Sequence, residues 1–279
     1  MSTLTPDLTL VRPRPLRNPL APLATLARRR FQLTAGTPRE LAVPLITPIL
    51  FALVIAPALK AALHTGSAYE SFVATGTIGL LIPLNTLFSG LSVIVDRESG
   101  AQRELLAAPV PRALLVLGNL VVAFAITALQ IGVLIGVAVA RGIHFHVTGA
   151  GLVWFLGAGA LFAVGMYGVA ETLASRIPKA EEYIARVPAI GIVPWFLAGA
   201  LFPITALPVV MTWIARFLPL THALALVRYG LLDDRGALHD IWGMSSTGAM
   251  AGLSLLVVAA FAAALMAASI RVFTRSAVG

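Results

Sequence analysis

Long apolar segments, almost free of charged side chains, constrain this chain more than any other feature. A helix needs about 20 apolar residues to cross the hydrocarbon core of a bilayer. Six segments reach that length, at about residues 41–63, 71–95, 113–140, 147–173, 187–205 and 245–270. None shows the strict alternation of a barrel strand, and only 11% of the 279 residues are charged, too few to cover a soluble surface of this size. We therefore expect an all-α polytopic membrane protein with six transmembrane helices.

The distribution of Lys and Arg predicts the orientation of these helices. Fifteen of the 20 cations lie before the first span, after the second, after the fourth or after the sixth. Cytoplasmic loops carry an excess of Lys and Arg. The sequence therefore places both termini in the cytoplasm, and it leaves five cations outside: Lys60, Arg141, Arg216, Arg228 and Arg235.

The residues before the first span are polar, rich in Pro and Arg, and contain no apolar core of a cleavable signal peptide. We expect residues 1–18 to be a disordered cytoplasmic leader. Residues 19–36 combine leucines and Phe31 with Arg28, Arg29 and Arg30, which is typical of an amphipathic helix lying on anionic headgroups. A disordered basic tail is the alternative for this second stretch.

The loop after the second span holds the densest charge cluster in the chain. Two prolines, Pro109 and Pro111, end any helix there. A charge run is usually a solvated surface, but in a chain with so few charges this one favours docking to a soluble partner. Its charged residues are Asp96, Arg97, Glu98, Arg103 and Glu104.

The fifth apolar segment cannot be one straight helix. It runs uncharged from 187 to 215, and Pro203, Pro208 and then Pro219 interrupt it and its continuation. We predict that the span ends near Phe202 and that a re-entrant or interfacial hairpin follows on the extracellular face, with Trp213 at headgroup level.

Two polar side chains inside the spans are functional candidates. Glu171 lies about one turn from the predicted cytoplasmic boundary, where pairing with Arg176, or simple placement at the boundary, is favoured over a role in proton coupling. Asn85 is an amide in an apolar run and should face protein or substrate rather than lipid. His144 and His146 form a pair in a short loop, too few ligands for a metal site, and the chain has no cysteine.

Motifs for chemistry on nucleotides are missing from the sequence. A P-loop needs Gly-Lys followed by Ser or Thr, whereas both lysines, Lys60 and Lys179, precede Ala. We therefore expect no enzyme activity, and no ATP or Mg bound by this chain. A multi-span protein with a charged docking loop then requires an engine on another subunit.

Two stretches carry a resemblance to a known family. Gly199-x-x-Phe202-Pro203-x-x-x-Leu207-Pro208, followed by Trp213, by Pro219-Leu220-Thr221-His222-Ala223 and by Arg228, is one; Asp96-Arg97-Glu98-Ser99-Gly100 through Pro111-Arg112 is the other. Together they resemble the membrane subunits of ABC type-2 exporters, the group that includes daunorubicin-resistance, nodulation-factor and polysaccharide export permeases. The resemblance extends from about Arg28 to the tail, and His222 departs from it, since such proteins often have Tyr there.

The resemblance implies a half-transporter of the bacterial inner membrane. Its partners are an ATP-binding subunit, which holds ATP and Mg, and a second permease chain, identical or different; membrane lipid surrounds it and nucleic acid has no part. In this interpretation three groups of residues have roles. They are the coupling candidates Asp96, Arg97, Glu98, Arg103 and Glu104; the outer hairpin Phe202, Pro203, Pro208, Pro219 and Arg228; and the candidate cavity residues Asn85, Phe88, Trp195 and Phe196.

Substrate class is the most open question. Spans with almost no charge and 8% aromatic residues favour export of a hydrophobic drug or lipid-like molecule. Export of a polysaccharide or glycolipid by the same machinery is an alternative. A proton-coupled secondary transporter with Glu171 as the carrier, or a membrane anchor without transport, remain alternatives from other classes.

Overall fold

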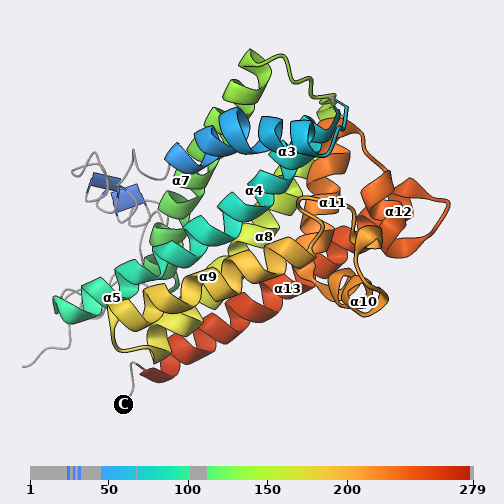
Figure 1. Ribbon diagram of the computed structural model, residues 1–279. Coiled ribbons are helices and arrows are strands. Elements are labelled where there is room, and N and C mark those ends of the chain that lie inside the picture. The colour runs from blue at the N-terminus through green and yellow to red at the C-terminus, as the bar shows by residue number, and fades with distance from the viewer. Residues whose placement is uncertain are drawn as a thin grey trace, which may run out of the picture.

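The computed structural model describes residues 24, 25, 28, 31, 32, 45–66, 68–100 and 112–276, and that part of the chain is helical with no strand (Figure 1). A helical stretch from Leu45 leads into the first element. The elements are η1 (Phe51–Ile55), α3 (Ala56–Ala62), α4 (Ala68–Ser89), α5 (Leu91–Glu98), α7 (Arg112–Ala140), α8 (Gly149–Arg176), α9 (Ala180–Leu197), η2 (Ile204–Ala206), α10 (Val209–Phe217), α11 (Pro219–Leu232), α12 (Gly236–Trp242) and α13 (Thr247–Ser276).

Five helices are long and apolar enough to cross a membrane: Leu45–Ala62, Ala68–Glu98, Gly118–Ala140, Gly149–Arg176 and Thr247–Val272. The pair α10 and α11 would make a sixth if it were one span, but it is bent by 79°. Its two helices lie between the end of α9 and the start of α13. The predicted all-α membrane fold is therefore confirmed, and the sixth crossing has to be found between α9 and the bent pair.

Helix α9 lies beside α4 and is not among the five helices that are long and apolar enough to cross a membrane. Its first two turns carry Glu181, Glu182 and Arg186, which lower its mean hydropathy. It nevertheless runs antiparallel along α4, because Tyr183 Oη donates to the Leu87 carbonyl at 2.5 Å and Trp195 Nε1 donates to the Gly76 carbonyl at 2.7 Å. Helix α9 runs from Ala180 to Leu197, so it begins and ends earlier than the predicted fifth span, 187–205.

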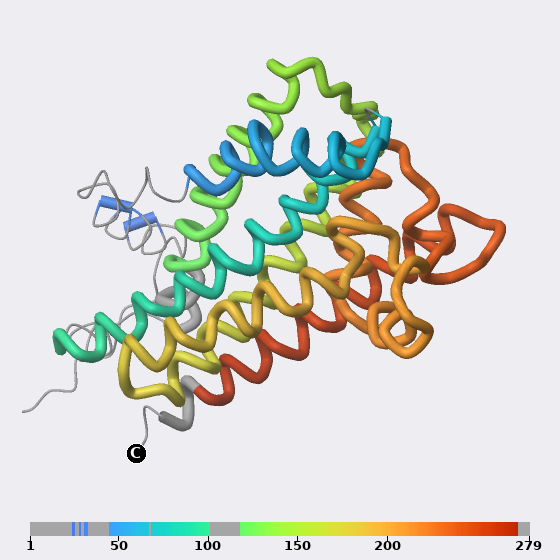
Figure 2. Tube along the Cα trace, viewed as in Figure 1, coloured from blue at the N-terminus to red at the C-terminus, as the bar shows by residue number. Residues whose placement is uncertain are grey.

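The two ends of the bundle differ in the elements that they contain, and we call them the hairpin end and the α5 end (Figure 2). At the hairpin end lie α10, α11 and α12, together with the turns 63–66 and 141–148. At the α5 end lie α5, the turn 177–179 between α8 and α9, and the last turns of α13. The bent pair stays at the hairpin end, since the Leu231 carbonyl accepts from His146 N beside the start of α8. The pair is therefore the predicted re-entrant hairpin.

Helix α4 is the centre of the bundle and the first span is its periphery. In the most apolar window of the α4–α5 helix 67% of the residues are buried, against 17% in the first span. Helix α4 contacts α7, α8, α9 and α11, which explains why its polar residues Thr75, Thr77 and Thr86 are fully buried. Their hydroxyls donate to carbonyls of the preceding turn, so burial leaves them satisfied.

Predictions about the leader are mostly outside the described residues. The proposed disordered segment 1–18 lies there entirely. Of the proposed amphipathic helix 19–36, the structure describes Ala24, Thr25, Arg28, Phe31 and Gln32, which are helical and exposed.

Candidate functional site

The candidate site at the hairpin end is built around a break in the chain after α9. Ala198 N still donates to the Pro194 carbonyl, and Gly199 then adopts a φ of +80°, which ends the helix. Pro203 precedes the single turn η2, Pro208 precedes α10, and Pro219 begins α11. The predicted hairpin residues thus set the ends of these short helices.

Arg228 on α11 is the residue that holds this break closed. Its Nη2 donates to the carbonyls of Gly199 at 2.8 Å and Ala200 at 3.1 Å, and its Nε reaches the Thr75 hydroxyl at 3.4 Å. The guanidinium carbon lies 3.6 Å from the centre of the Phe72 ring, a cation–π contact. Only 3% of Arg228 is exposed. A buried charge is costly unless its donors are paired, so these contacts fix α11 to α4 and to the end of α9.

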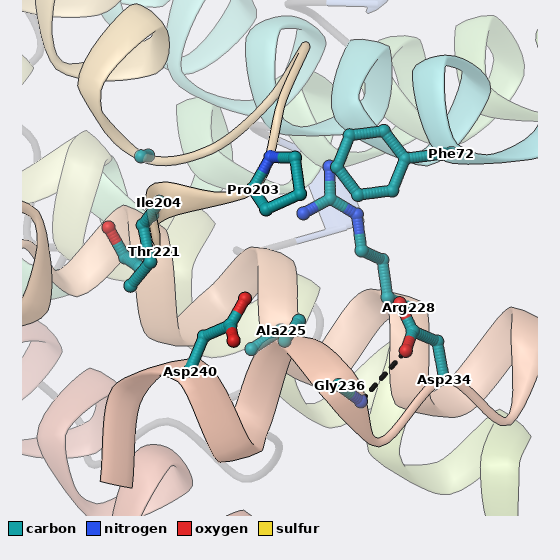
Figure 3. A pocket seen from close by; sticks show the side chains of 11 residues that line it. Phe72, Pro203, Ile204, Thr221, Ala225, Arg228, Asp234, Gly236 and Asp240 are labelled. Atoms are coloured by element: carbon teal, nitrogen blue, oxygen red, sulfur yellow. Dashed lines mark hydrogen bonds between the residues drawn. The ribbon is translucent and has the colours of Figure 1, made fainter. Parts of the chain in front are cut away.

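A cavity of about 180 Å³ lies beside Arg228, between the hairpin and α12 (Figure 3). This volume is below the roughly 300 Å³ or more of a typical drug-sized site. It is therefore too small to be the substrate cavity by itself. Its lining includes Phe72, Pro203, Ile204, Thr221, Ala225, Arg228, Asp234, Gly236 and Asp240.

Two carboxylates face this cavity from the segment after α11. Asp234 accepts from Gly236 N at 2.8 Å (Figure 3). Burial, and then the charge of Asp234, raise the pKa of Asp240, while His239, Arg216 and Arg228 act in the opposite direction. The hydroxyl of Thr221 is buried and has no hydrogen-bond partner among the described residues. The carboxylates thus offset the buried guanidinium of Arg228 at longer range.

His222 on α11 joins three parts of the hairpin end. Its Nε2 lies 2.9 Å from the Arg216 carbonyl and its Nδ1 lies 3.2 Å from the Ser254 hydroxyl on α13. A carbonyl can only accept, so Nε2 carries the proton and Nδ1 accepts from Ser254, whose oxygen accepts from Trp242 Nε1 at 2.8 Å. This departure from the family pattern therefore has a structural role: it locks α10, α12 and α13 together.

At the α5 end the predicted coupling residues divide in two. Arg97 is turned inward, where it donates to the carbonyls of Ala174 at 3.1 Å, Ile177 at 2.6 Å and Pro178 at 3.1 Å and so caps the end of α8. Asp96 is half-buried, whereas Glu98 is exposed. Arg103 and Glu104 lie outside the described residues. Of the described coupling candidates, Glu98 is the one that offers an exposed charge to a partner.

The four predicted cavity residues divide into two that are engaged inside the bundle and two that are exposed. Asn85 Nδ2 donates to the Gln130 side chain on α7, and Trp195 is buried between α9 and α4. Phe88 is 44% exposed and Phe196 is 48% exposed, on the outer surface of the bundle. The amide pair and Trp195 are therefore packing contacts between helices, and the two phenylalanines are available only to something outside this chain.

Glu171 is buried on α8, 4% exposed, and its neighbour Tyr167 donates a hydrogen bond to it. Arg176, the partner predicted from the sequence, is exposed at the end of α8. A tyrosine one turn away supplies a donor. The structure thus keeps Glu171 in an internal contact, in line with a structural role.

Two functional candidates were missed by the sequence reasoning, namely Glu70 on α4 and Arg141 after α7. Arg141 Nη2 lies 3.2 Å from Glu70 Oε1, and Lys60 Nζ lies 3.4 Å from Glu70 Oε2. Glu70 directly precedes the predicted second span, 71–95, and no pattern in the sequence marks Arg141 or Lys60 as its partners. Among the described residues, no group of three or more His, Cys, Asp or Glu could hold a metal ion.

Comparison with known families places these features in context. The family described as ABC-2 type transporter matches residues 22–232, a stretch that runs from before the first span to the end of α11 and includes both α5 and the hairpin. A search among curated proteins found no match.

Proposed function

The chain belongs to the ABC-2 type transporter family as a transmembrane permease, and from that premise we propose that it exports a hydrophobic small molecule, a drug or lipid-like compound, with ATP hydrolysed by a separate subunit. The observation that carries the proposal is the family match on a chain of membrane-crossing helices. In this proposal ATP and Mg bind to the partner, and the substrate leaves the cytoplasm or the inner leaflet. The protein lies in the bacterial inner membrane with both termini cytoplasmic.

The α5 end is the proposed contact with the ATP-binding subunit. It carries the cation-rich loops, which supports a cytoplasmic position. Glu98 presents an exposed carboxylate at the end of α5, while Arg97 ties α5 to the end of α8. A displacement of Glu98 by the partner would therefore move α8, through the Arg97 contacts, and α4, through the continuous α4–α5 helix. Arg103 and Glu104 stay in the proposed coupling set on sequence grounds.

A second permease chain is part of the proposal, because one subunit offers no large binding cavity beside Arg228. The exposed phenylalanines Phe88 and Phe196 face outward from α4 and α9. They can contact a substrate only if its pathway runs between two permease chains. Asn85 and Trp195, which are engaged inside the bundle, then act on that pathway by positioning α4 rather than by direct contact.

The hairpin is the proposed outer lid. Its position depends on Arg228, whose partners lie on α4 and at the end of α9. A rearrangement of α4 driven from the α5 end would shift Thr75 and Phe72 under the guanidinium. This gives a physical route from ATP binding at one end to opening at the other.

The test is co-purification with a P-loop ATPase encoded beside this chain, followed by ATP hydrolysis measured with a panel of hydrophobic compounds. Glu98→Lys should leave expression intact and remove the compound-dependent stimulation, because it reverses the charge offered to the partner. Glu98→Gln and Asp233→Asn form a matched pair, each removing one exposed carboxylate at opposite ends. Only the first should reduce stimulation; equal stimulation in both variants and in Glu98→Lys would remove α5 from the coupling proposal.

Vesicle transport separates this proposal from a proton-coupled carrier. Export in vesicles given ATP but no proton gradient is the expected result. Transport that requires the gradient and ignores ATP would contradict the proposal and return attention to Glu171.

A further inference from the structure

The first span contains a break that its own backbone does not repair. In the π-turn η1, Ala56 N donates to the carbonyl of Phe51, five residues back. In that register the next donor along the chain is residue 57, which should serve the carbonyl of Ala52. Residue 57 is proline, which has no N–H. Ala52 is buried, 2% exposed, so its carbonyl needs a donor from elsewhere.

Arg141, the residue after α7, supplies that donor. Its Nη1 lies 2.6 Å from the Ala52 carbonyl. Gly142 follows with a φ of +82° and turns the chain away, so Arg141 stands at the very end of the helix. Its side chain is 29% exposed, and the contact it makes joins the third span to the first.

The same guanidinium also pairs with the acid at the start of α4. Arg141 Nη2 donates to Glu70 Oε1, and Lys60 from the first span reaches the other oxygen, Oε2. The Glu70 side chain is 9% exposed. A single carboxylate therefore connects the first three spans, with Arg141 bound both to it and to the break.

These contacts matter because the first span has little else to hold it. Only 17% of its most apolar window is buried, and Leu50, Leu53, Val54 and Leu63 are exposed. π-Turns occur often at functional positions and are points where a helix can bend. The turn at 51–55 lies between the helical stretch that begins at Leu45 and α3, whose Lys60 reaches Glu70.

We propose that Arg141 is a positioning residue for the first span: it replaces the hydrogen bond that Pro57 cannot make to Ala52 and thereby sets α3 against α4 and α7. The π-turn is the hinge, and the Arg141–Ala52 contact holds it in the position seen here. The inference concerns the movement of one helix, and it stands whether or not the exported compound and the ATPase partner are those proposed above.

Hydrogen–deuterium exchange of the full-length protein in lipid nanodiscs tests the proposal, with the amides of residues 58–63 as the readout. Arg141→Gln should speed their exchange roughly tenfold or more, because a charge-assisted bond to a buried carbonyl is lost. Adding Pro57→Ala gives Ala52 a donor within its own helix. The double variant should therefore exchange within about twofold of Pro57→Ala alone.

Glu70→Gln is the matched control, because it removes the ion pairs and leaves the Arg141–Ala52 bond. Its exchange should rise less than that of Arg141→Gln, and Pro57→Ala should not reverse the rise. If Arg141→Gln does not fold, Arg141→Lys, which keeps one donor, should show an intermediate increase that Pro57→Ala reverses. Unchanged exchange in the Arg141 variants, or an increase that Pro57→Ala leaves in place, overturns the proposal.

Discussion

The two ends of the bundle use charged side chains in opposite ways. At the hairpin end, Arg228 and Glu70 are buried, and Arg228 and Arg141 donate to main-chain carbonyls at breaks in helices. At the α5 end, Glu98, Glu181 and Glu182 are exposed, while Arg97 and the buried Glu171 are turned inward. Broken helices within a membrane must have their free carbonyls satisfied. The hairpin end has more helix breaks, so its cations bind main-chain carbonyls within the subunit. The α5 end leaves several carboxylates exposed, where another molecule can contact them.

Replacing Arg228 should have the largest effect and would test the contrast most directly. Arg228→Leu leaves two carbonyls and the Thr75 hydroxyl without their donor and removes one of the cations that offset Asp234 and Asp240. We expect a loss of about 3–5 kcal/mol, as for one partner removed from a buried polar network. Thermal melting of the purified protein measures it. Arg235→Leu, a surface arginine near the same hairpin, is the control and should change stability by less than about 0.5 kcal/mol.

Filling the contact between α4 and the end of α9 should have the next largest effect. A Cβ at Gly76 would lie 2.0 Å from the Ala200 carbonyl oxygen. Gly76→Ala must therefore displace the segment after α9, whose carbonyls at Gly199 and Ala200 bind Arg228. We expect a loss of about 1–3 kcal/mol by overpacking. Gly132→Ala on α7, where nothing lies within 4 Å, is the matched control. It should be neutral or stabilising by up to about 1 kcal/mol; equal melting temperatures for the two variants would contradict the predicted close contact.

Arg97 tests whether the α5 end depends on the same kind of contact. Arg97→Leu removes a cation from three carbonyls at the end of α8, but the site is partly open to water. We expect a loss of about 1–2 kcal/mol, smaller than that for Arg228. Arg186→Leu, which breaks only an exposed pair with Glu182 at 3.9 Å, should cost less than about 0.5 kcal/mol. A loss in Arg97→Leu as large as that in Arg228→Leu would remove the distinction between the ends.

Asp240 should give the smallest effect and a distinctive pH dependence. Its pKa is higher in the folded protein than in the unfolded chain, so the folded state binds the proton more tightly. Its charged form therefore destabilises the fold above the folded pKa, and protonation removes this penalty as the pH falls. Asp240→Asn should raise the melting temperature slightly near pH 7 and leave it unchanged near pH 3. A difference between variant and parent that widens toward low pH would reverse the predicted sign.

The main lines of the fold were predictable from local sequence. Exclusion of charge from hydrocarbon marks each span within a window of about 20 residues. The prolines at 203, 208 and 219 predicted a broken segment because each removes an N–H at its own position. The predicted fifth span, 187–205, left out Glu181, Glu182 and Arg186, whereas helix α9 already packs along α4 from Ala180.

The partners of the charged residues were not predictable in the same way. Arg228 reaches carbonyls 28 and 29 residues away and a hydroxyl 153 residues away, and Glu70 lies 71 residues before Arg141. No pattern along the chain records such distances. Asn85 was expected to face protein or substrate; its Gln130 partner stands 45 residues on, on another helix.

The sequence by itself determined which segments are apolar enough to cross a membrane, because each charged residue placed in hydrocarbon adds its own unfavourable transfer free energy. It also determined where helices must break, since proline and a left-handed glycine act at their own positions. Only the tertiary structure decided which cations repair those breaks. Arg141 and Arg228 read as two of five outer charges until the fold brought each within hydrogen-bonding distance of a carbonyl that its own helix had left free.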